Sequence, residues 1–391
     1  MSIKYRNLNP PSRLLLGPGP SNVDPQVLRA MATPLIGHLD PEFIKIMDDT
    51  KQLLQYTFQT DNYLTLPVSG TGSAGMEAAL CNVIEPGDNV AVCVSGLFGQ
   101  RMCDIVQRCR GQLIRIDAEW GRAVDPHQVE PVLKQFKVKV VAIVHAETST
   151  GILQPLEDIR RLAHDHGALL LVDAVTSLGG CELKVDEWEL DVVYSGTQKC
   201  LSCPPGLAPI TFSPRAQKLL DERQTQVQSW YLDMTMIQRY WGQERFYHHT
   251  APISMCYAFR EALRLVYDEG LEVRWQRHEL NHRALMAGLQ AMGLRPFAAE
   301  GYRLPSLNAV WVPEGIQDAK VRGRLLQDYG IEIGGGLGKL KGQIWRIGLM
   351  GFNSTKKTVM VFLSALEAAL RAEGYQASPG AALAAAQEVY D

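Results

Sequence analysis

Four short hydrophobic runs recur along the first half of the chain. They are rich in Val, Ile and Leu, and they occupy residues 89–94, 138–144, 168–172 and 191–194. Near-continuous runs of this length are typical of strands that are buried on both faces of a mostly parallel sheet. The pattern therefore predicts an α/β region from about residue 61 to about residue 250.

Between two of these runs the hydrophobic spacing changes to that of a helix. Residues 156–166 repeat apolar side chains every three to four positions, and Gly167 stands where a C-terminal cap is expected. A strand, a helix and a second strand form the crossover unit of α/β folds. This order supports a sheet whose strands are connected through helices.

The pattern changes after about residue 254. It predicts a helix at 254–269, which Gly270 ends. It then predicts two strands, at 306–313 and 343–348, with a helix between them at 319–329. The Ala-rich end at 381–386 predicts a weak helix or a frayed tail. We therefore predict an extended N-terminal segment, a large α/β domain and a smaller C-terminal α+β domain, at residues 1–25, 26–253 and 254–391.

The composition excludes several classes of protein. Hydrophobic residues make up 46% and charged residues 21%, the mix of a folded globular protein. The net charge of −3 shows no basic excess, so we expect no nucleic acid as a partner. The apolar runs are too short to cross a bilayer, so we expect no membrane association. Eight cysteines without an export signal are expected to be reduced thiols, which predicts a cytoplasmic protein.

Two residues at the ends of predicted strands carry the first candidate chemistry. Lys199 follows the strand at 191–194, and Asp173 follows the run at 168–172. Ligands of open α/β sheets bind beyond the carboxyl ends of the strands, so we expect these side chains to converge. A Lys that forms a Schiff base and an Asp that pairs with a pyridine nitrogen are what pyridoxal 5'-phosphate requires. The alternatives are a surface Lys199 and an Asp173 that ligates a metal.

A glycine-rich stretch at 68–80 is the candidate phosphate site. It leads directly into a helical pattern, and Thr71 and Ser73 are residues that favour helix N-caps. Free N–H groups at the start of a helix attract an anion. The stretch has neither the Gly-Lys-Ser/Thr of a Walker loop nor a full dinucleotide fingerprint. A plain helix start is the alternative.

Two further side chains fit the same chemistry. Phe98 follows the strand at 89–94, and its ring either stacks on a pyridine ring or fills the core. Arg346 interrupts an apolar strand, and its guanidinium either binds the carboxylate of an amino acid or forms a structural ion pair.

No metal site is predicted. Cys200 and Cys203 have metal-type spacing but lack a second pair, and His248 and His249 are neighbours that point opposite ways in an extended segment.

Taken in order, the motifs resemble those of the class V aminotransferases, which are fold type I pyridoxal-phosphate enzymes, and above all the alanine–glyoxylate and serine–glyoxylate branch. The resemblance covers nearly the whole chain. Its motifs are LGPGPSN at 16–22, SGTG at 69–72, FGQR at 98–101, ETSTGILQP at 147–155, LLVD at 170–173, YSGTQK at 194–199 with PPG at 204–206, YHHT at 247–250 and RIG at 346–348.

The resemblance implies the fold and the roles of the residues around the cofactor. The large domain would hold a mostly parallel, seven-stranded α/β sheet with flanking helices. Lys199 would hold pyridoxal 5'-phosphate through a Schiff base, and Asp173 would pair with its ring nitrogen. Phe98 would stack on the ring, and Thr148 would lie beside it near its phenolic oxygen. The phosphate would be bound by Thr71, Gly72, Ser73 and Gln198.

The resemblance also implies how substrate and subunits are bound. Arg346 would take the substrate carboxylate, and Gly19 with the adjoining N-terminal segment would form the rim of the pocket and part of a dimer interface. Tyr247 and Thr250 would reach the phosphate of the neighbouring subunit, which makes the active unit a homodimer with shared active sites. At two positions the chain departs from the branch, which commonly has Trp in place of Phe98 and His in place of Ser73.

The implied reaction is the transfer of an amino group from a small amino acid to glyoxylate, through pyridoxamine phosphate, to give glycine and a 2-oxo acid. Alanine is the first candidate for the donor and serine the second. Alternatives on the same fold are serine–pyruvate or aminophosphonate transamination and cysteine desulfuration. A further alternative is a protein that binds the cofactor without turnover. A desulfurase would stack a His on the ring and carry its catalytic Cys on a mobile loop. Here Phe98 occupies the ring position, and Cys200 directly follows Lys199.

Overall fold

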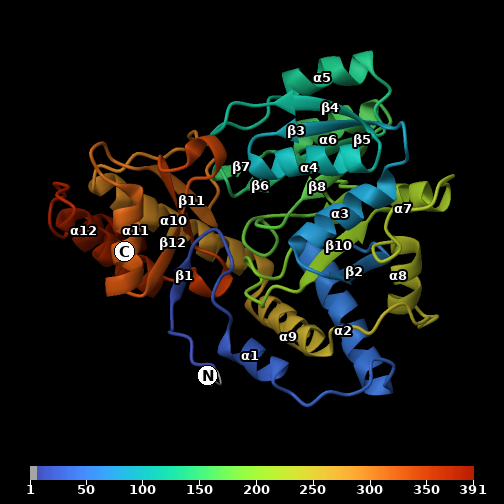
Figure 1. The fold of residues 1–391 in the computed structure, drawn as a ribbon, viewed down its shortest axis with the longest axis horizontal. Helices are drawn as coiled ribbons and strands as arrows, with labels where there is room; N and C mark the ends of the chain where they lie inside the picture. The colour runs from blue at the N-terminus through green and yellow to red at the C-terminus, as the bar shows by residue number, and fades with distance from the viewer. Residues whose placement is uncertain (1–6) are drawn as a thin grey trace, which may run out of the picture.

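A seven-stranded sheet forms the centre of the larger of two lobes (Figure 1). The computed structural model describes residues 7–391, and within them the strands follow the order β2-β10-β9-β8-β5-β3-β4. All neighbours are parallel except that β10 runs antiparallel to β2 and β9. The strands are β2 Leu64–Ser69, β3 Asn89–Val94, β4 Gln112–Asp117, β5 Val140–Val144, β8 Leu169–Asp173, β9 Val192–Tyr194 and β10 Leu207–Phe212. The predicted mostly parallel sheet is confirmed.

The central strands are buried because helices pack against the sheet. Every residue of β5 and β8 is buried, as their unbroken hydrophobic runs predict. α6 turns Ile159, Leu162 and Ala163 inward, and Gly167 follows it at a φ of 75°. The helices of this lobe are α1 Pro25–Met31, α2 Pro41–Phe58, α3 Gly72–Val83, α4 Leu97–Arg108, α5 Pro126–Gln135, α6 Glu157–Asp165, α7 Pro214–Asp221, α8 Met234–Trp241 and α9 Ile253–Glu269.

The smaller lobe has its own sheet and its own core. The sheet has the strand order β1-β12-β13-β11, with β1 Leu14–Leu16, β11 Leu307–Trp311, β12 Ile331–Gly335 and β13 Ile344–Gly348. Val310, Trp345 and Phe362 are fully buried in its core. The helices are α10 Leu271–Ala291, α11 Asp318–Asp328, α12 Lys356–Ala372 and α13 Ala381–Tyr390. α13 packs on α10 through Ala382 and Ala386, so the Ala-rich end is a docked helix and not a frayed tail.

The N-terminal segment joins the two lobes. Leu14–Leu16 pairs in parallel with Ile331–Ile333, so β1 is an edge strand of the smaller lobe's sheet. The sequence predicts an extended segment up to residue 25 but does not reveal this strand, because three apolar residues are too few to show a period and their partner is remote in sequence. Residues 1–6 of the predicted segment lie outside the described residues. The chain then crosses to the larger lobe, where the Ser21 N–H donates to the Gln198 carbonyl at 2.9 Å.

A short hairpin completes the fold near the carboxyl end of β5. It pairs β6 Ala146–Glu147 with β7 Ile152–Leu153 in antiparallel fashion. Within the described part of the chain, none of the helices has the length and apolarity needed to cross a membrane.

Candidate active site

A cavity of about 190 Å³ lies at the carboxyl ends of β5, β8 and β9. Seven of the residues predicted for the site line it: Gly72, Ser73, Phe98, Thr148, Asp173, Gln198 and Lys199. They come from five separate stretches of sequence, which only the fold brings together. The expected convergence of Lys199 and Asp173 at one edge of the sheet is therefore observed.

Lys199 is a buried amine that has no carboxylate partner among residues 7–391. Its side chain is in the cavity wall, only 8% of its surface is exposed, and Nζ donates to the Pro18 carbonyl. Burial lowers the pKa of Lys199 to about 8 because the charged form loses its hydration. A sizeable fraction of the amine is therefore unprotonated near neutral pH and able to attack a carbonyl carbon. A surface position for Lys199 is excluded.

Asp173 is the last residue of β8, and two hydrogen bonds orient its carboxylate. Oδ2 accepts from the Tyr194 hydroxyl at 2.7 Å, and Oδ1 accepts from the Val175 N–H at 2.8 Å. Burial raises the pKa of Asp173 to about 6, although both hydrogen bonds oppose the rise. A cationic partner in the cavity would offset this cost of charging the carboxylate. Tyr194 was not predicted as a site residue, since a Tyr within a strand reads as core.

The start of α3 offers unused hydrogen-bonding groups to the cavity. Thr71 is the N-cap, yet its hydroxyl makes no capping hydrogen bond. Before it, Gly70 has a φ of 156°, and a Cβ there would come within 2.5 Å of the Ala74 side chain. Gly72 and Ser73 line the cavity together with Gln198, whereas Thr71 is exposed and is not part of its wall. Free N–H groups at the start of a helix fit a phosphate group. Gln198 Oε1 is buried and has no partner among the described residues; as an acceptor, it would need a donor other than the phosphate.

Arg101 adds a positive charge to this phosphate region. Its Nη1 donates to Ser73 Oγ at 3.1 Å, and its guanidinium carbon lies 5.0 Å from the centre of the Phe98 ring. The residue also lines the cavity. Arg101 ends the FGQR motif, but the sequence does not predict its role, because its contact with Ser73 depends on the packing of α3 beside α4.

A buried carboxylate fixes the helix that carries Phe98. Glu147 is fully buried and accepts from the Phe98 N–H at 3.0 Å, the Ser149 N–H at 3.0 Å and the Ser149 hydroxyl at 2.6 Å. Burial raises the pKa of Glu147 against these hydrogen bonds. A Cβ at Gly96 would lie 2.5 Å from the Glu147 side chain, so only glycine fits there. Glu147 thus sets the position of Phe98 at the cavity, a role that was not predicted.

Arg346 lies beside the cavity in the middle of β13, with 5% of its surface exposed. Among the residues that the structure describes, its guanidinium donates only to backbone carbonyls, from Nε to Gly335 at 2.8 Å and from Nη1 to Thr148 at 3.2 Å. Burial lowers the pKa of Arg346 to about 10. The alternative of a structural ion pair is therefore not observed, and the group can bind a carboxylate.

Gly19 packs directly on Lys199. Its φ is 108°, and a Cβ would come within 2.5 Å of Lys199 Nζ. A side chain here would occupy the place of the amine, which explains why the segment needs glycine at this point.

Tyr247 and Thr250 are not brought into the cavity of their own chain. The Tyr247 side chain is exposed, and its hydroxyl lies 3.5 Å from Thr250 Oγ1, so the two polar groups are neighbours on the surface. Between them the expectation of opposed histidines is wrong. The Nδ1 atoms of His248 and His249 are 2.8 Å apart, and His249 Nε2 lies 2.7 Å from Ser69 Oγ, because the segment bends. No group of three or more candidate ligands for a metal ion occurs within residues 7–391.

The comparisons with known proteins agree with this geometry. A family model described as aminotransferase class-V matches residues 14–355. The chain is 42% identical to the (S)-ureidoglycine–glyoxylate transaminase of Bacillus subtilis, over 99% of this chain and 97% of that protein. It is also 42% identical to the alanine–glyoxylate aminotransferase of Callithrix jacchus, over 93% and 89%.

Two solved structures have nearly the same fold. The alanine–glyoxylate aminotransferase from Nostoc sp. superposes with a TM-score of 0.93 at 49% identity, covering 94% of this chain and 98% of that one. The ureidoglycine–glyoxylate aminotransferase from Bacillus subtilis gives 0.97 at 44% identity, covering 98% and 100%. The predicted family, fold, cofactor and type of reaction are therefore confirmed. The chain belongs to the class V aminotransferases and is a pyridoxal-phosphate-dependent transaminase of fold type I.

Proposed function

We propose that this transaminase moves an amino group from a small amino acid to glyoxylate, giving glycine and a 2-oxo acid, with alanine as the first candidate donor and serine as the second. The observation that carries the proposal is the carboxylate-free guanidinium of Arg346 beside a small cavity that also holds Lys199. Arg346 suits an α-carboxylate, which both substrates possess. Because the same cavity also takes the cofactor, little room remains for a substrate side chain.

Each residue of the site contributes a separate part of this reaction. When bound, pyridoxal phosphate supplies a ring that withdraws the negative charge developing at the substrate Cα. Asp173 keeps the ring nitrogen protonated, which the hydrogen bonds from Tyr194 and Val175 make possible by holding the carboxylate in place. Lys199 would hold the cofactor. Its Nζ, as a free amine in the cavity wall, would also be the base that takes a proton from the substrate Cα, and a pKa of about 8 suits that role.

The remaining residues bind and orient. Thr71, Gly72, Ser73 and Gln198 would donate to the phosphate, and the uncapped Thr71 hydroxyl at the start of α3 and the Arg101 guanidinium beside Ser73 support this role. Phe98 would cover one face of the ring, Thr148 would lie by its phenolic oxygen, and Gly19 leaves space for the amine of Lys199.

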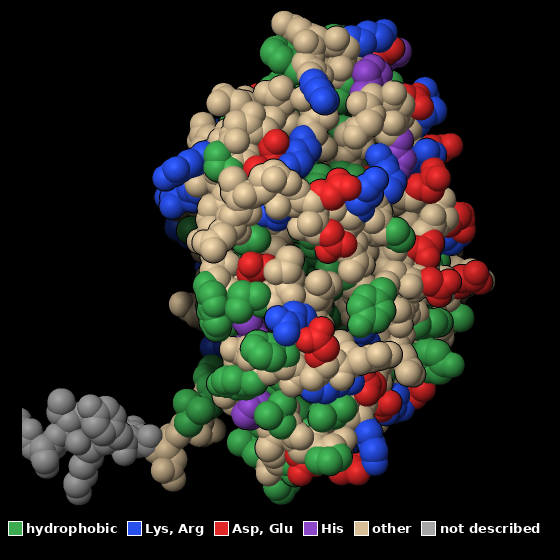
Figure 2. Space-filling view, turned by 90° about the vertical axis from the view of Figure 1, so that its right-hand side faces the viewer, with side chains coloured by type: hydrophobic (Ala, Val, Ile, Leu, Met, Phe, Trp, Pro, Cys, Tyr) green, Lys and Arg blue, Asp and Glu red, His purple; other side chains and the backbone are tan. Residues whose placement is uncertain are grey.

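The active unit that we propose is a homodimer with shared active sites, in which Tyr247 and Thr250 bind the phosphate of the partner subunit. Their hydroxyls converge on the surface, and the same segment exposes Trp230, Tyr231 and Phe246. Figure 2 views the side that carries α7 and α8, and hydrophobic side chains gather over its lower half. Exposed aromatic residues in one segment are typical of an interface. Light scattering of the purified protein tests the dimer, and a monomer of full activity would contradict it. The cytoplasmic location stays a prediction.

A further donor, (S)-ureidoglycine, is a candidate comparable to alanine. It is favoured by the relative from Bacillus subtilis, whose similarity extends over 99% of this chain. Serine–pyruvate and aminophosphonate transamination are further alternatives on this fold, and cysteine desulfuration is the most distant one.

A panel of donors against glyoxylate separates these activities. Glycine formation from glyoxylate is measured with alanine, serine, glutamate and (S)-ureidoglycine, and alanine formation is measured with serine and pyruvate. We expect kcat/KM to be highest for glyoxylate with alanine or (S)-ureidoglycine. An aminophosphonate that outperforms every α-amino acid would overturn the role of Arg346, and sulfide released from cysteine would indicate the lyase.

A further inference from the structure

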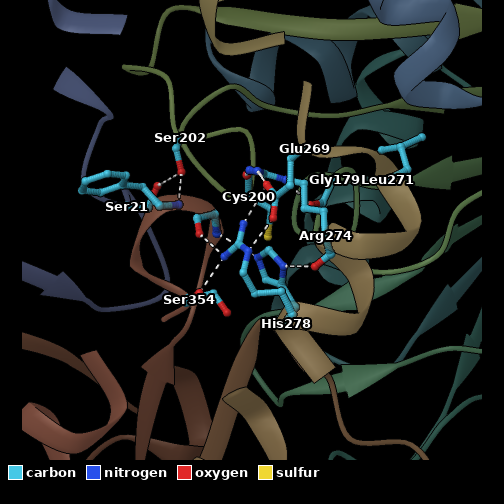
Figure 3. Close-up of polar contacts among 12 residues, drawn as sticks. Ser21, Gly179, Cys200, Ser202, Glu269, Leu271, Arg274, His278 and Ser354 are labelled. Carbon is cyan, nitrogen blue, oxygen red and sulfur yellow. Dashed lines mark hydrogen bonds and ion pairs between the residues drawn. The ribbon is translucent and has the colours of Figure 1, made fainter. Parts of the chain in front are cut away.

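Arg274 connects three separate segments beneath the loop that carries Lys199 (Figure 3). It lies in the first turn of α10, and only 6% of its surface is exposed. Nε donates to the Gly179 carbonyl at 2.8 Å, Nη1 to Glu269 at 2.5 Å and Nη2 to the Cys200 carbonyl at 2.5 Å. The last contact is with the residue that directly follows Lys199.

The backbone at Lys199 is held from two sides. The Lys199 carbonyl accepts from the Ser21 hydroxyl at 2.9 Å and from the Ser202 N–H at 3.0 Å. The Cys200 carbonyl accepts from Arg274, and a Cβ placed at Gly351 would come within 2.5 Å of that oxygen. Two consecutive carbonyls are therefore fixed, and with them the peptide plane from which the Lys199 side chain departs.

The helix carries this constraint into the smaller lobe. His278, one turn after Arg274, has its Nδ1 2.7 Å from the Arg274 carbonyl, and its Nε2 accepts from the Gly351 N–H at 2.9 Å. The Phe352 N–H donates to Ser202 Oγ at 2.7 Å, so the loop at 351–352 also holds the loop after Lys199. The constraint on Lys199 is thus part of the contact between the two lobes.

A guanidinium is the group that this arrangement requires. Burial lowers the pKa of Arg274, and the charge of Glu269 opposes that shift. The planar fork reaches one carboxylate and two carbonyls at the same time, whereas an ammonium is a single point. A Lys at this position would keep the charge but would leave at least one of the two carbonyls without its donor.

We propose that Arg274 is a positioning residue for Lys199, which fixes the direction of the Lys199 side chain through the Cys200 carbonyl. The inference rests on the proposed function of Lys199 as the residue that attaches the cofactor. Arg274 itself touches neither the cavity nor the substrate. Its effect is on the geometry with which Lys199 Nζ meets its reaction partner.

Arg277 provides a matched control on the same helix. It also pairs with Glu269, with Nε at 2.5 Å, and it donates to the carbonyls of Gly351 at 2.9 Å and Ser354 at 2.6 Å. It makes no hydrogen bond to the carbonyl of Lys199 or Cys200 within the described residues. A loss of stability from the ion pair should therefore follow either substitution. Lys199 should be displaced more by the substitution at Arg274, because Arg277 reaches the loop after Lys199 only indirectly, through the peptide at 351–352.

The experiment compares Arg274→Lys and Arg274→Gln with Arg277→Lys and Arg277→Gln. Pyridoxal phosphate is added to each cofactor-free protein, the rate of its covalent attachment is followed by absorbance, and the attached residue is identified by borohydride reduction and peptide mapping. Tm of the cofactor-free protein, kcat and KM are measured in parallel. We expect the Arg274 variants to slow both attachment and kcat by about tenfold, because small displacements of a reacting atom cost this much or more.

The outcomes separate the two claims. The Arg277 variants should lower Tm but slow attachment clearly less than the Arg274 variants do, and KM for the donor should change less than about twofold in all four. If Arg274→Lys leaves both the attachment rate and kcat unchanged, the positioning role is overturned. It is also overturned if both Arg274 variants fail to fold while both Arg277 variants fold, because Arg274 would then be purely structural. Failure of the unaltered protein to attach the cofactor at Lys199 would instead refute the proposed function.

Discussion

The buried carboxylate of Asp173 should give the cofactor-free protein a pH-dependent stability that Asp173→Asn removes. Its pKa of about 6 compares with an ordinary value of 3.8. Between these values the folded protein keeps a proton that the unfolded chain has lost, so stability falls as pH rises from about 4 to about 6. The difference in pKa corresponds to about 3 kcal/mol, as an upper limit for a group that is 2% exposed.

The assay is urea unfolding of the cofactor-free protein and of Asp173→Asn between about pH 5 and about pH 7.5. Asparagine stays neutral, so the variant should gain stability relative to the unaltered protein by about 1.4 kcal/mol as pH rises from about 5 to about 7.5. Asp165→Asn is the control, because Asp165 is an exposed carboxylate at the end of α6. A difference between Asp173→Asn and the unaltered protein that stays constant with pH would refute the reasoning.

Four further substitutions test single contacts. Lys199→Ala should abolish covalent attachment of the cofactor and turnover, and near-normal kcat would remove Lys199 from its role. Arg346→Ala should lower kcat/KM for α-carboxylate substrates by about 10²-fold, measured in steady-state kinetics, and an unchanged value would place the carboxylate elsewhere. Glu147→Gln should cost about 1–3 kcal/mol in urea unfolding, because its amide N–H₂ must face a backbone or hydroxyl donor, and a neutral result would contradict this. Gly19→Ala should slow attachment at Lys199, followed by absorbance, because the new Cβ would occupy the position of Nζ.

The strands of the large sheet were predictable because each is a local run. The prediction at 89–94 coincides with β3, and the run at 168–172 differs from β8 Leu169–Asp173 by one residue at each end. Burial on both faces demands consecutive apolar residues, and this demand is visible in the sequence without knowledge of the partners. The same holds for Lys199 and Asp173, because a residue that follows such a strand must lie at its carboxyl end.

The contacts that refine the site could not be read from the chain, because they join distant residues. Glu147 meets the Phe98 N–H across 49 positions, and Arg274 meets the Cys200 carbonyl across 74. A buried acid and a buried Arg have no periodic signature, and their partners are backbone groups that every residue possesses. The pairing of β1 with β12 was missed for the same reason, since three leucines are an edge strand only when β12 is beside them.

Burial draws both principal groups of the site toward neutrality before any cofactor binds. It lowers the pKa of Lys199 to about 8 and raises that of Asp173 to about 6. For Lys199 this shift serves the proposed reaction directly, because the neutral amine would be the nucleophile and the base. For Asp173 the shift opposes the proposed role, which needs the charged carboxylate. A protonated ring nitrogen beside Asp173 would lower the pKa of this carboxyl again. Cofactor binding should therefore strengthen as pH rises through about 6. The bound cofactor should also make the folded protein more stable than the cofactor-free protein.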